Sequence, residues 1–197
     1  IANFPYIKPD EIVVLYSPKK RSALNEEQNI LEKFNVDKKE YFLLTMGNRW
    51  AKNNYRAVMA FDSIFTKFPD INKKVLILGV TNEKVYKSIK NRNMFIFRNY
   101  VSENELEMLY KYSYAFIYPT LNEGFGYPPI EAMKYGTLVA AAAITSVSEI
   151  CGDAALYFNP YSVEEMEDRI LDLVYETDFD KRSEKAIERY KLVSEKQ

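Results

Sequence analysis

The sequence predicts an α/β fold: a doubly wound parallel sheet of Rossmann-like architecture. Short runs rich in Val, Ile, Tyr and Phe alternate along the chain with segments whose apolar residues recur at helical spacing, as in repeated βα units. The apolar runs show no alternation of polar and apolar residues, which is typical of parallel strands covered on both faces. The chain has 197 residues, and we expect them to form a single domain because no linker or internal repeat divides them.

Seven runs are predicted to be strands because they are short and rich in β-branched and aromatic residues. In order, they cover residues 11–16, 41–46, 74–80, 94–97, 114–119, 137–142 and 155–158. Between the second and third of these, a helix is expected to start near residue 54. Its apolar face is formed by Ala57, Phe61, Ile64, Phe65 and Phe68, which lie at i, i+4, i+7, i+8 and i+11.

Two later helices carry a start signal. Ser102 stands three residues before Glu105, and Ser162 stands three residues before Glu165. In a capping box, the serine side chain accepts a hydrogen bond from the third helical N–H, and the glutamate accepts one from the serine N–H. We therefore expect a capping box at the start of each of these helices.

Composition excludes several classes of function. There are 27 Lys plus Arg against 28 Asp plus Glu, for a net charge of −1, so no general nucleic-acid binding is expected. The chain has no histidine, which removes Ser-His-Asp and Cys-His catalysis and His-ligated metals. Cys151 is the single cysteine and is expected to be a packing residue. Any chemistry must use carboxylates, Lys, Arg, Tyr, hydroxyl groups or backbone dipoles.

Neither a signal peptide nor an apolar stretch of roughly 20 residues is present in the sequence. We therefore expect a cytoplasmic location. The chain starts at Ile1 and stops within a helical pattern, so both ends look cut. On this interpretation the chain is a fragment of a longer protein.

The loop after the second predicted strand brings two cations to a strand-to-helix turn. Residues 47–54 read Gly-Asn-Arg-Trp-Ala-Lys-Asn-Asn, with Arg49 and Lys52 as the cations. A helix N-terminus offers unpaired N–H groups that attract an anion, and the two cations would add to that field. The alternative is an exposed loop with solvated cations, in which Asn53 or Asn54 caps the helix.

A second strand-to-helix loop, residues 119–133, contains two glycines and two glutamates. Gly124 and Gly126 would let a ligand approach the backbone, and Pro128 suits the first turn of a helix. Glu123 and Glu131 are separated by seven residues. The turn could hold a diphosphate while the carboxylates accept hydrogen bonds from sugar hydroxyls. Alternatively, the glycines form a tight turn and Glu131 complements the helix dipole.

Three segments taken together resemble a known family. PTLNEGFGYPPIEAMKYGTLVAA followed by SVSEICGDAALYFNP, the upstream GNRWAKNNYRAVMAF, and FRNYVSENELEMLYKYSYAFIYPT resemble the retaining nucleotide-sugar glycosyltransferases of family four, which have the GT-B fold. The resemblance covers nearly the whole chain and corresponds to the carboxyl-terminal, donor-binding half of such enzymes. It implies that residues 1–197 form one donor-binding domain of a longer two-domain enzyme.

The resemblance also implies catalytic residues. Lys52 matches the lysine that binds the donor diphosphate, and Glu123 matches the glutamate beside the transferred sugar. Arg49 matches the companion arginine only if the loop is shorter here. Many members place that arginine five residues before the lysine, where this chain has Gly47.

Donor-binding residues follow from the same resemblance. Glu131 matches the glutamate that holds the ribose hydroxyls of the donor. The residues expected to contact the diphosphate, the sugar or the base are Gly47, Gly124, Phe125, Gly126, Tyr100 and Val101. The partners implied are a nucleoside-diphosphate sugar and an amino-terminal acceptor-binding domain, with peripheral membrane association through that missing half.

The implied reaction moves a hexose from the donor to an acceptor hydroxyl, in polysaccharide or glycoconjugate biosynthesis. Fixed cations and backbone N–H groups would stabilise the leaving diphosphate, so neither a metal nor another cofactor is expected. Without its amino-terminal domain the fragment is expected to be inactive.

The alternatives are a non-catalytic nucleotide-binding or protein-interaction module and a flavodoxin-like receiver domain, which would need acidic residues where Ser17, Pro18, Lys19 and Lys20 follow the first strand. The sequence leaves the base, sugar, acceptor and oligomeric state open.

Overall fold

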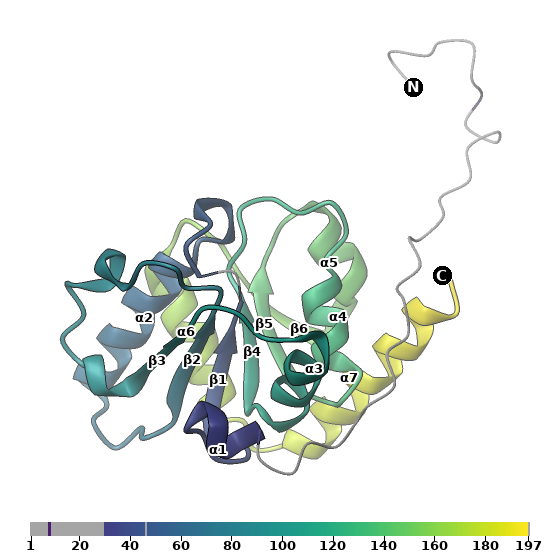
Figure 1. The fold of residues 1–197 in the computed structure, drawn as a ribbon. Coiled ribbons are helices and arrows are strands. Elements are labelled where there is room, and N and C mark those ends of the chain that lie inside the picture. The colour runs from purple at the N-terminus through teal and green to yellow at the C-terminus, as the bar shows by residue number, and fades with distance from the viewer. Residues whose placement is uncertain (1–7, 9–29, 46, 197) are drawn as a thin grey trace.

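The computed structural model describes residue 8, residues 30–45 and residues 47–196. This part of the chain forms a six-stranded, entirely parallel sheet with the order β3-β2-β1-β4-β5-β6 (Figure 1). The strands are β1 (Tyr41–Leu44), β2 (Lys74–Leu78), β3 (Phe95–Arg98), β4 (Ala115–Tyr118), β5 (Leu138–Ala142) and β6 (Ala155–Phe158). In the register, Phe42 of β1 lies opposite Val75 of β2 and Ala115 of β4. The predicted Rossmann-like fold class is confirmed.

Six predicted strands are confirmed, the one at 155–158 with the predicted bounds and the other five with shifted ends. The strand predicted at 11–16 lies outside the described residues. The run predicted at 74–80 ends at Leu78, because Gly79 takes a φ of 78° and so leaves the extended conformation. The run predicted at 41–46 is a strand only to Leu44. Apolar runs therefore located the strands but overestimated the lengths of four of them.

Helices precede, connect and follow the strands, except between β2 and β3, where the connection has only 3-10 turns. The helices are α1 (Ile30–Phe34), α2 (Asn54–Lys67), α3 (Glu103–Tyr112), α4 (Tyr127–Met133), α5 (Thr145–Cys151), α6 (Val163–Val174) and α7 (Phe179–Ser194). Helix α2 starts at the predicted position, but Phe68 lies one residue beyond its end and is 37% exposed. No helix of the described residues is long and apolar enough to span a bilayer.

The two predicted capping boxes differ in the structure. At α3, Ser102 and Glu105 form both hydrogen bonds of the box. At α6, Ser162 accepts from the Glu165 N–H, but the Glu165 carboxylate accepts from the Asn159 N–H at 2.8 Å. The prediction of a full box at α6 is wrong, because the carboxylate satisfies the backbone of the preceding loop instead.

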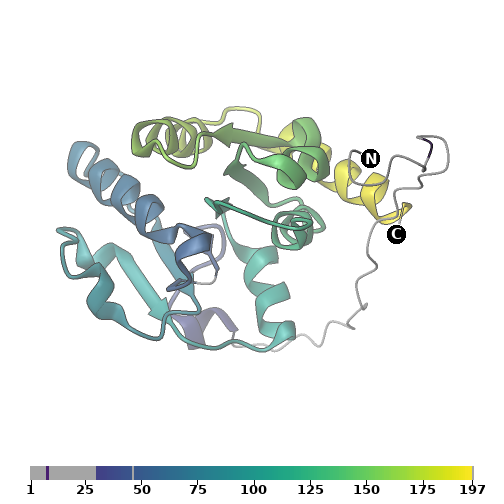
Figure 2. The same cartoon turned by 90° about the horizontal axis from the view of Figure 1, so that it is seen from above.

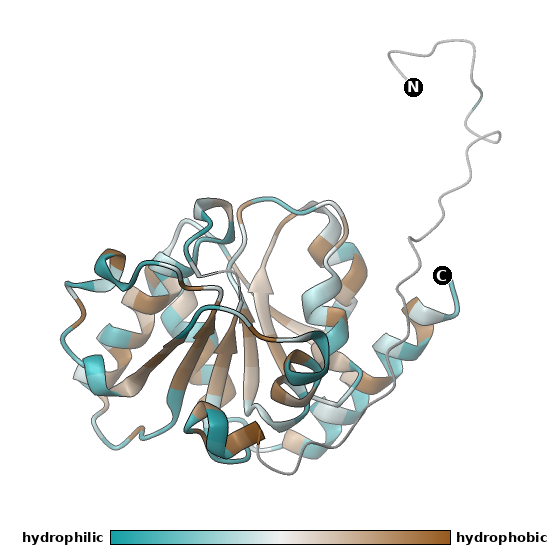
Figure 3. Ribbon diagram, viewed as in Figure 1, coloured by the Kyte–Doolittle hydropathy of each residue, from teal (hydrophilic) through white to brown (hydrophobic). Residues whose placement is uncertain are grey.

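Helices cover both faces of the sheet. Helices α2 and α6 pack on one face, and α3, α4 and α7 pack on the other (Figure 2). The strands between them are predominantly hydrophobic, whereas the helices turn polar residues outward (Figure 3). The connections from the neighbouring strands β1 and β4 leave toward opposite faces, so a crevice is expected between the loops at their carboxyl ends.

Candidate functional site

The loops after β1 and β4 are joined to one another. The Leu121 N–H donates to the Ala51 carbonyl at 2.7 Å, and the Thr120 hydroxyl donates to the same oxygen at 3.1 Å. Both loops lie at the carboxyl edge of the sheet, at the top of Figure 1. The two loops that were predicted to bind a ligand therefore lie side by side.

Lys52 and Glu123 form an ion pair at this junction. Lys52 is the last residue of η2 (Trp50–Lys52), a 3-10 turn, and is only 8% exposed. Its Nζ also donates to the Tyr118 hydroxyl at 3.2 Å and lies 5.3 Å from the centre of the Tyr118 ring. The site therefore holds one desolvated cation against one carboxylate and one aromatic ring.

Tyr118 was not predicted as a site residue, although it links both charged groups. Burial raises the pKa of its hydroxyl far above the usual value, and the hydrogen bond to Glu123 adds to this effect. The hydroxyl therefore stays protonated, accepting from Lys52 and donating to Glu123. The signal that could have identified Tyr118 from the sequence is its position. It is the last residue of a buried strand, directly before Pro119, at the edge of the sheet where ligands bind.

The asparagines of the first loop hold it in place. Asn53, with a φ of 58°, donates through Nδ2 to the carbonyls of Pro119 at 2.9 Å and Pro160 at 2.7 Å. Asn54 donates to the Thr45 carbonyl at 2.6 Å. Asn53 makes no side-chain cap at α2, so the alternative of a solvated loop with an asparagine cap is wrong for Asn53 and for Lys52.

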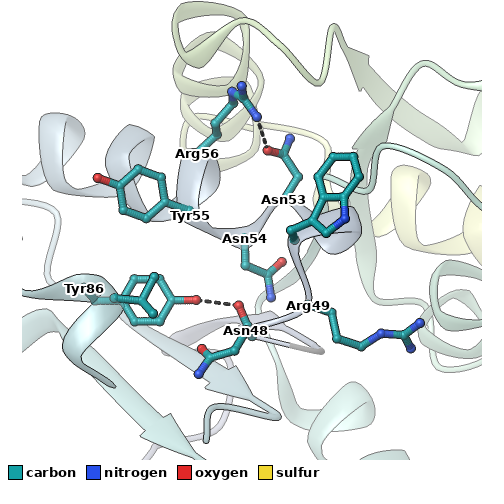
Figure 4. A pocket seen from close by; sticks show the side chains of 10 residues that line it. Asn48, Arg49, Asn53, Asn54, Tyr55, Arg56 and Tyr86 are labelled. Atoms are coloured by element: carbon teal, nitrogen blue, oxygen red, sulfur yellow. Dashed lines mark hydrogen bonds between the residues drawn. The ribbon is translucent and has the colours of Figure 1, made fainter. Parts of the chain in front are cut away.

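Gly47 and Arg49 occupy the start of the same loop. Gly47 is buried, and a Cβ there would lie 2.4 Å from the Val80 side chain, so packing against β2 requires a glycine. Arg49 is exposed, and its side chain extends away from Tyr55 and Tyr86 (Figure 4). The loop thus places its two predicted cations in different environments: Lys52 buried and Arg49 in solvent.

The second loop is shaped by its glycines. Gly126 precedes α4 with a φ of 110°, a conformation that favours glycine. A Cβ on Gly124 would meet nothing within 4 Å, so the backbone there is open to a ligand. The Ser146 hydroxyl donates to the Glu123 carbonyl at 2.9 Å, and the rings of Phe125 and Tyr127 lie 4.5 Å apart. Pro128 lies in the first turn of α4, as predicted.

The remaining predicted donor residues lie at two places. Glu131 is half-buried in α4, and its charge adds to the effect of burial in raising the pKa of Tyr110 and of Tyr118. Tyr100 and Val101 follow β3, which β2 separates from β1. Tyr100 is 83% exposed, whereas Val101 packs partly against the core.

A pocket that was not predicted opens beside the first loop. Its volume is about 240 Å³. It is lined by Gly47, Asn48, Arg49, Trp50, Asn53, Asn54, Tyr55, Arg56, Val85 and Tyr86 (Figure 4). The Tyr86 hydroxyl closes one side by donating to the Gly47 carbonyl at 2.6 Å. The pocket lies between α2 and the turn η3 (Glu83–Tyr86). Of the predicted donor residues, Gly47 and Arg49 line it, whereas Lys52 and Glu123 do not.

Comparison with known proteins assigns the family. The sequence profile of the glycosyl transferases group 1 matches residues 26–191. The chain belongs to this family. The O-antigen chain mannosyltransferase RfbU of Salmonella typhimurium is 29% identical over 165 residues, which are 81% of this chain and 43% of that protein. The chain therefore spans less than half the length of this curated relative.

Solved structures support the fold. WaaG, a glycosyltransferase involved in lipopolysaccharide biosynthesis, superposes with a TM-score of 0.72 at 16% identity, over 96% of this chain and 54% of that one. The C-terminal domain of the group 1 glycosyltransferase LpcC from Francisella tularensis superposes with a TM-score of 0.68 at 23% identity, over 88% of this chain and 93% of that one. The GT-B architecture of the resemblance is thus confirmed for the described residues.

Proposed function

We propose that this chain is the donor-binding domain of a retaining glycosyltransferase that transfers a hexose from a nucleoside-diphosphate sugar to an acceptor hydroxyl. The observation that carries the proposal is the buried Lys52 at the place where the β1 and β4 loops meet. Its ammonium group is already desolvated and is balanced by the Glu123 carboxylate. An incoming diphosphate can replace that carboxylate without the cost of desolvating a new cation.

Each predicted residue has a role in this proposal. Lys52 stabilises the charge that grows on the leaving diphosphate, and Arg49, exposed on the same loop, adds a second cation. Glu123, displaced from Lys52 by the diphosphate, binds the hydroxyls of the sugar, and Glu131 binds the ribose hydroxyls. The amides of the open 124–126 turn face the sugar and phosphate, and residues 100–101 reach the base. With these cations in place, the proposal requires no metal.

The substrate class follows from the relatives. RfbU is named as an O-antigen chain mannosyltransferase, and WbdA of Escherichia coli, 26% identical over 147 residues, as a serotype-specific mannosyltransferase. We therefore propose mannosyl transfer in the assembly of a surface polysaccharide, with the acceptor bound by a second, amino-terminal domain. A cytoplasmic location and peripheral membrane association through that domain stay predictions.

The non-catalytic alternative is weaker. A buried ion pair contributes little to stability once its desolvation is counted, so a module that only needed the fold would gain nothing from Lys52 and Glu123. Family membership also favours glycosyl transfer over a bare binding module.

Calorimetric titration with nucleoside diphosphates tests the proposal. GDP, UDP and dTDP are titrated into the wild-type chain, into Lys52→Ala and into Lys185→Ala. The last variant is a matched control, because Lys185 pairs with Asp153 at the surface, 2.9 Å away. We expect one diphosphate to bind the wild type and the control equally, and Lys52→Ala at least tenfold more weakly. Equal binding to all three proteins, or to none, would contradict the proposal.

A further inference from the structure

The pocket beside the β1 loop contains polar groups that lack partners. The side-chain oxygens of Asn48 and Asn54 are buried and accept no hydrogen bond from the described residues. Asn54 is 2% exposed and lies in the middle of the pocket residues (Figure 4). A buried acceptor without a donor is costly, and native proteins seldom leave one unsatisfied. Two such oxygens in the lining of one pocket would be matched by a ligand that donates hydrogen bonds.

The hydrogen bonds donated by the side-chain nitrogens of Asn48 and Asn54 identify the oxygen as the unpaired atom of each amide. The Asn54 Nδ2 donates to the Thr45 carbonyl at 2.6 Å, so its Oδ1 is oriented by that bond. The Asn48 Nδ2 donates to Asn82 O at 3.1 Å and to Thr81 Oγ1 at 3.4 Å. The second of these bonds is long, and Asn48 is half-exposed, so its amide can turn to meet an incoming group.

The rest of the lining combines aromatic and cationic groups. Trp50 is 81% exposed and Tyr55 is 45% exposed, and Tyr55 stacks on Tyr86 with ring centres 6.4 Å apart. Arg56 donates to Asn53 Oδ1 at 2.7 Å through one guanidinium nitrogen. The other N–H groups of the guanidinium can donate to a ligand. The pocket thus offers two acceptors, a donor fork and aromatic faces.

These requirements distinguish between ligand classes. An anion such as phosphate brings only acceptors at its ionised oxygens, so it could pair with Arg56 but would leave both asparagine oxygens unpaired. Hydroxyl groups both donate and accept, and can pair with the amides and with the guanidinium. A pyranose ring also presents C–H faces that pack on exposed aromatic rings such as Trp50.

We propose that this pocket binds one neutral hexose unit, as a subsite for the acceptor glycan on the donor-binding domain. Saccharide binding follows from the pocket alone, whereas its role as an acceptor subsite rests on the proposed function. The site lies on the α2 side of the β1 loop, and the Lys52–Glu123 pair lies where that loop meets the β4 loop. Arg49 and Trp50 line the pocket and Ala51 contacts the β4 loop, so a glycan held here would lie beside the proposed donor site.

Trp50 provides the test because it is the single tryptophan of the chain. Its emission is followed while methyl α-mannoside, methyl α-glucoside, inorganic phosphate or a nucleoside diphosphate is added to the 197-residue chain. We expect a saturable change with at least one hexoside and none with phosphate. The nucleoside diphosphate should not compete with that hexoside.

Variants separate the pocket from the donor site. Asn54→Ala and Asn48→Ala should each raise the apparent Kd for the hexoside roughly tenfold, as the loss of one buried hydrogen bond implies. Lys52→Ala and the exposed control Asn93→Ala should leave it unchanged. Thermal melting checks that each variant folds, and Asn48→Ala, at a half-exposed position, keeps the test valid if Asn54→Ala does not fold.

Three results would overturn the inference: no saturable change with any hexoside, an unchanged Kd in the folded asparagine variants, or competition by the nucleoside diphosphate. The last result would assign the pocket to the donor. Hexoside binding in a chain that binds no nucleoside diphosphate would support the saccharide pocket and contradict the proposed donor function, so the two failures are distinguishable.

Discussion

Lys52 and Arg49 stand three residues apart on one loop but occupy opposite environments. The turn η2 carries Lys52 inward, where Glu123 and Tyr118 hold it. Arg49, just before that turn, is exposed. One cation is therefore preorganised before any ligand arrives, and the other must be ordered by the ligand. A preorganised charge stabilises a transition state more effectively, because no free energy is spent in orienting it during the reaction.

The Lys52–Glu123 pair also differs from the ion pairs at the surface. Its side chains are 10% and 18% exposed, against 44% and 84% for Lys185 and Asp153. Exposed pairs contribute little to stability because solvent screens them. A buried pair is sensitive to the loss of either partner, because the other charge is then left uncompensated. The two regions should therefore respond differently to the same kind of substitution.

The largest expected effect is that of Lys52→Ala on sugar transfer by the proposed two-domain enzyme. Removing a preorganised charge from a leaving group should lower kcat about 100-fold, or by roughly 3 kcal/mol. Lys185→Ala, the matched surface variant, should leave kcat unchanged. Steady-state kinetics with a nucleotide-sugar donor measures both. Equal kcat in the two variants would remove the distinction between the buried and the exposed cation.

Tyr118→Phe should have the next largest effect. It removes the hydroxyl that accepts from Lys52 and donates to Glu123, while the ring and the core packing remain. We expect a loss of about 1 kcal/mol of stability and a fall in kcat of about tenfold. Tyr135→Phe is a suitable control, because its hydroxyl donates to Glu107 at 2.8 Å, away from the two loops. If kcat fell equally in both variants, the role of Tyr118 would be structural.

Glu123→Gln should separate diphosphate binding from transfer. Without the carboxylate, Lys52 has lost its competing anion, so the affinity for a nucleoside diphosphate should increase about fivefold, the equivalent of roughly 1 kcal/mol. Sugar transfer should fall in the same variant, since Glu123 is proposed to bind the sugar. Calorimetry and kinetics measure the two changes. A weaker diphosphate complex would show that Glu123 does not compete for Lys52.

Arg49→Ala should have the smallest effect. The side chain is exposed, so the free energy of unfolding should change by less than about 0.5 kcal/mol. Donor affinity should fall about threefold, since a solvated cation contributes less than a buried one. Denaturant titration and calorimetry give the two values. A loss as large as that of Lys52→Ala would show that the donor orders Arg49 into an equivalent position.

The sequence predicted the architecture because strand and helix signals are local. The apolar runs and the Ser102–Glu105 box act within a few residues, and a parallel sheet brings the loops after β1 and β4 to one edge whatever their composition. This reasoning places the loops that carry Lys52 and Glu123 at the same edge, and the structure shows the ion pair between them. The reasoning could not show that Lys52 is buried and Arg49 exposed, because a short 3-10 turn decides which side chain faces inward.

Other features depend on contacts between distant segments. Tyr118 looked like one more aromatic residue of an apolar strand, and only the packing of the two loops brings its hydroxyl between two charges. The pocket at Asn48 and Asn54 requires the turn at 83–86, whose position depends on contacts with α2. The cap of α6 is a further example. The local pattern predicts that the Glu165 carboxylate accepts from the Ser162 N–H, but in the structure it accepts from the Asn159 N–H.

The most direct test of the account is a crystal structure of the chain with the nucleoside diphosphate that binds it most tightly. The account predicts a phosphate oxygen within roughly 2.9 Å of Lys52 Nζ, with the Glu123 carboxylate displaced from the ammonium group. A diphosphate bound elsewhere, with the Lys52–Glu123 pair intact, would contradict it.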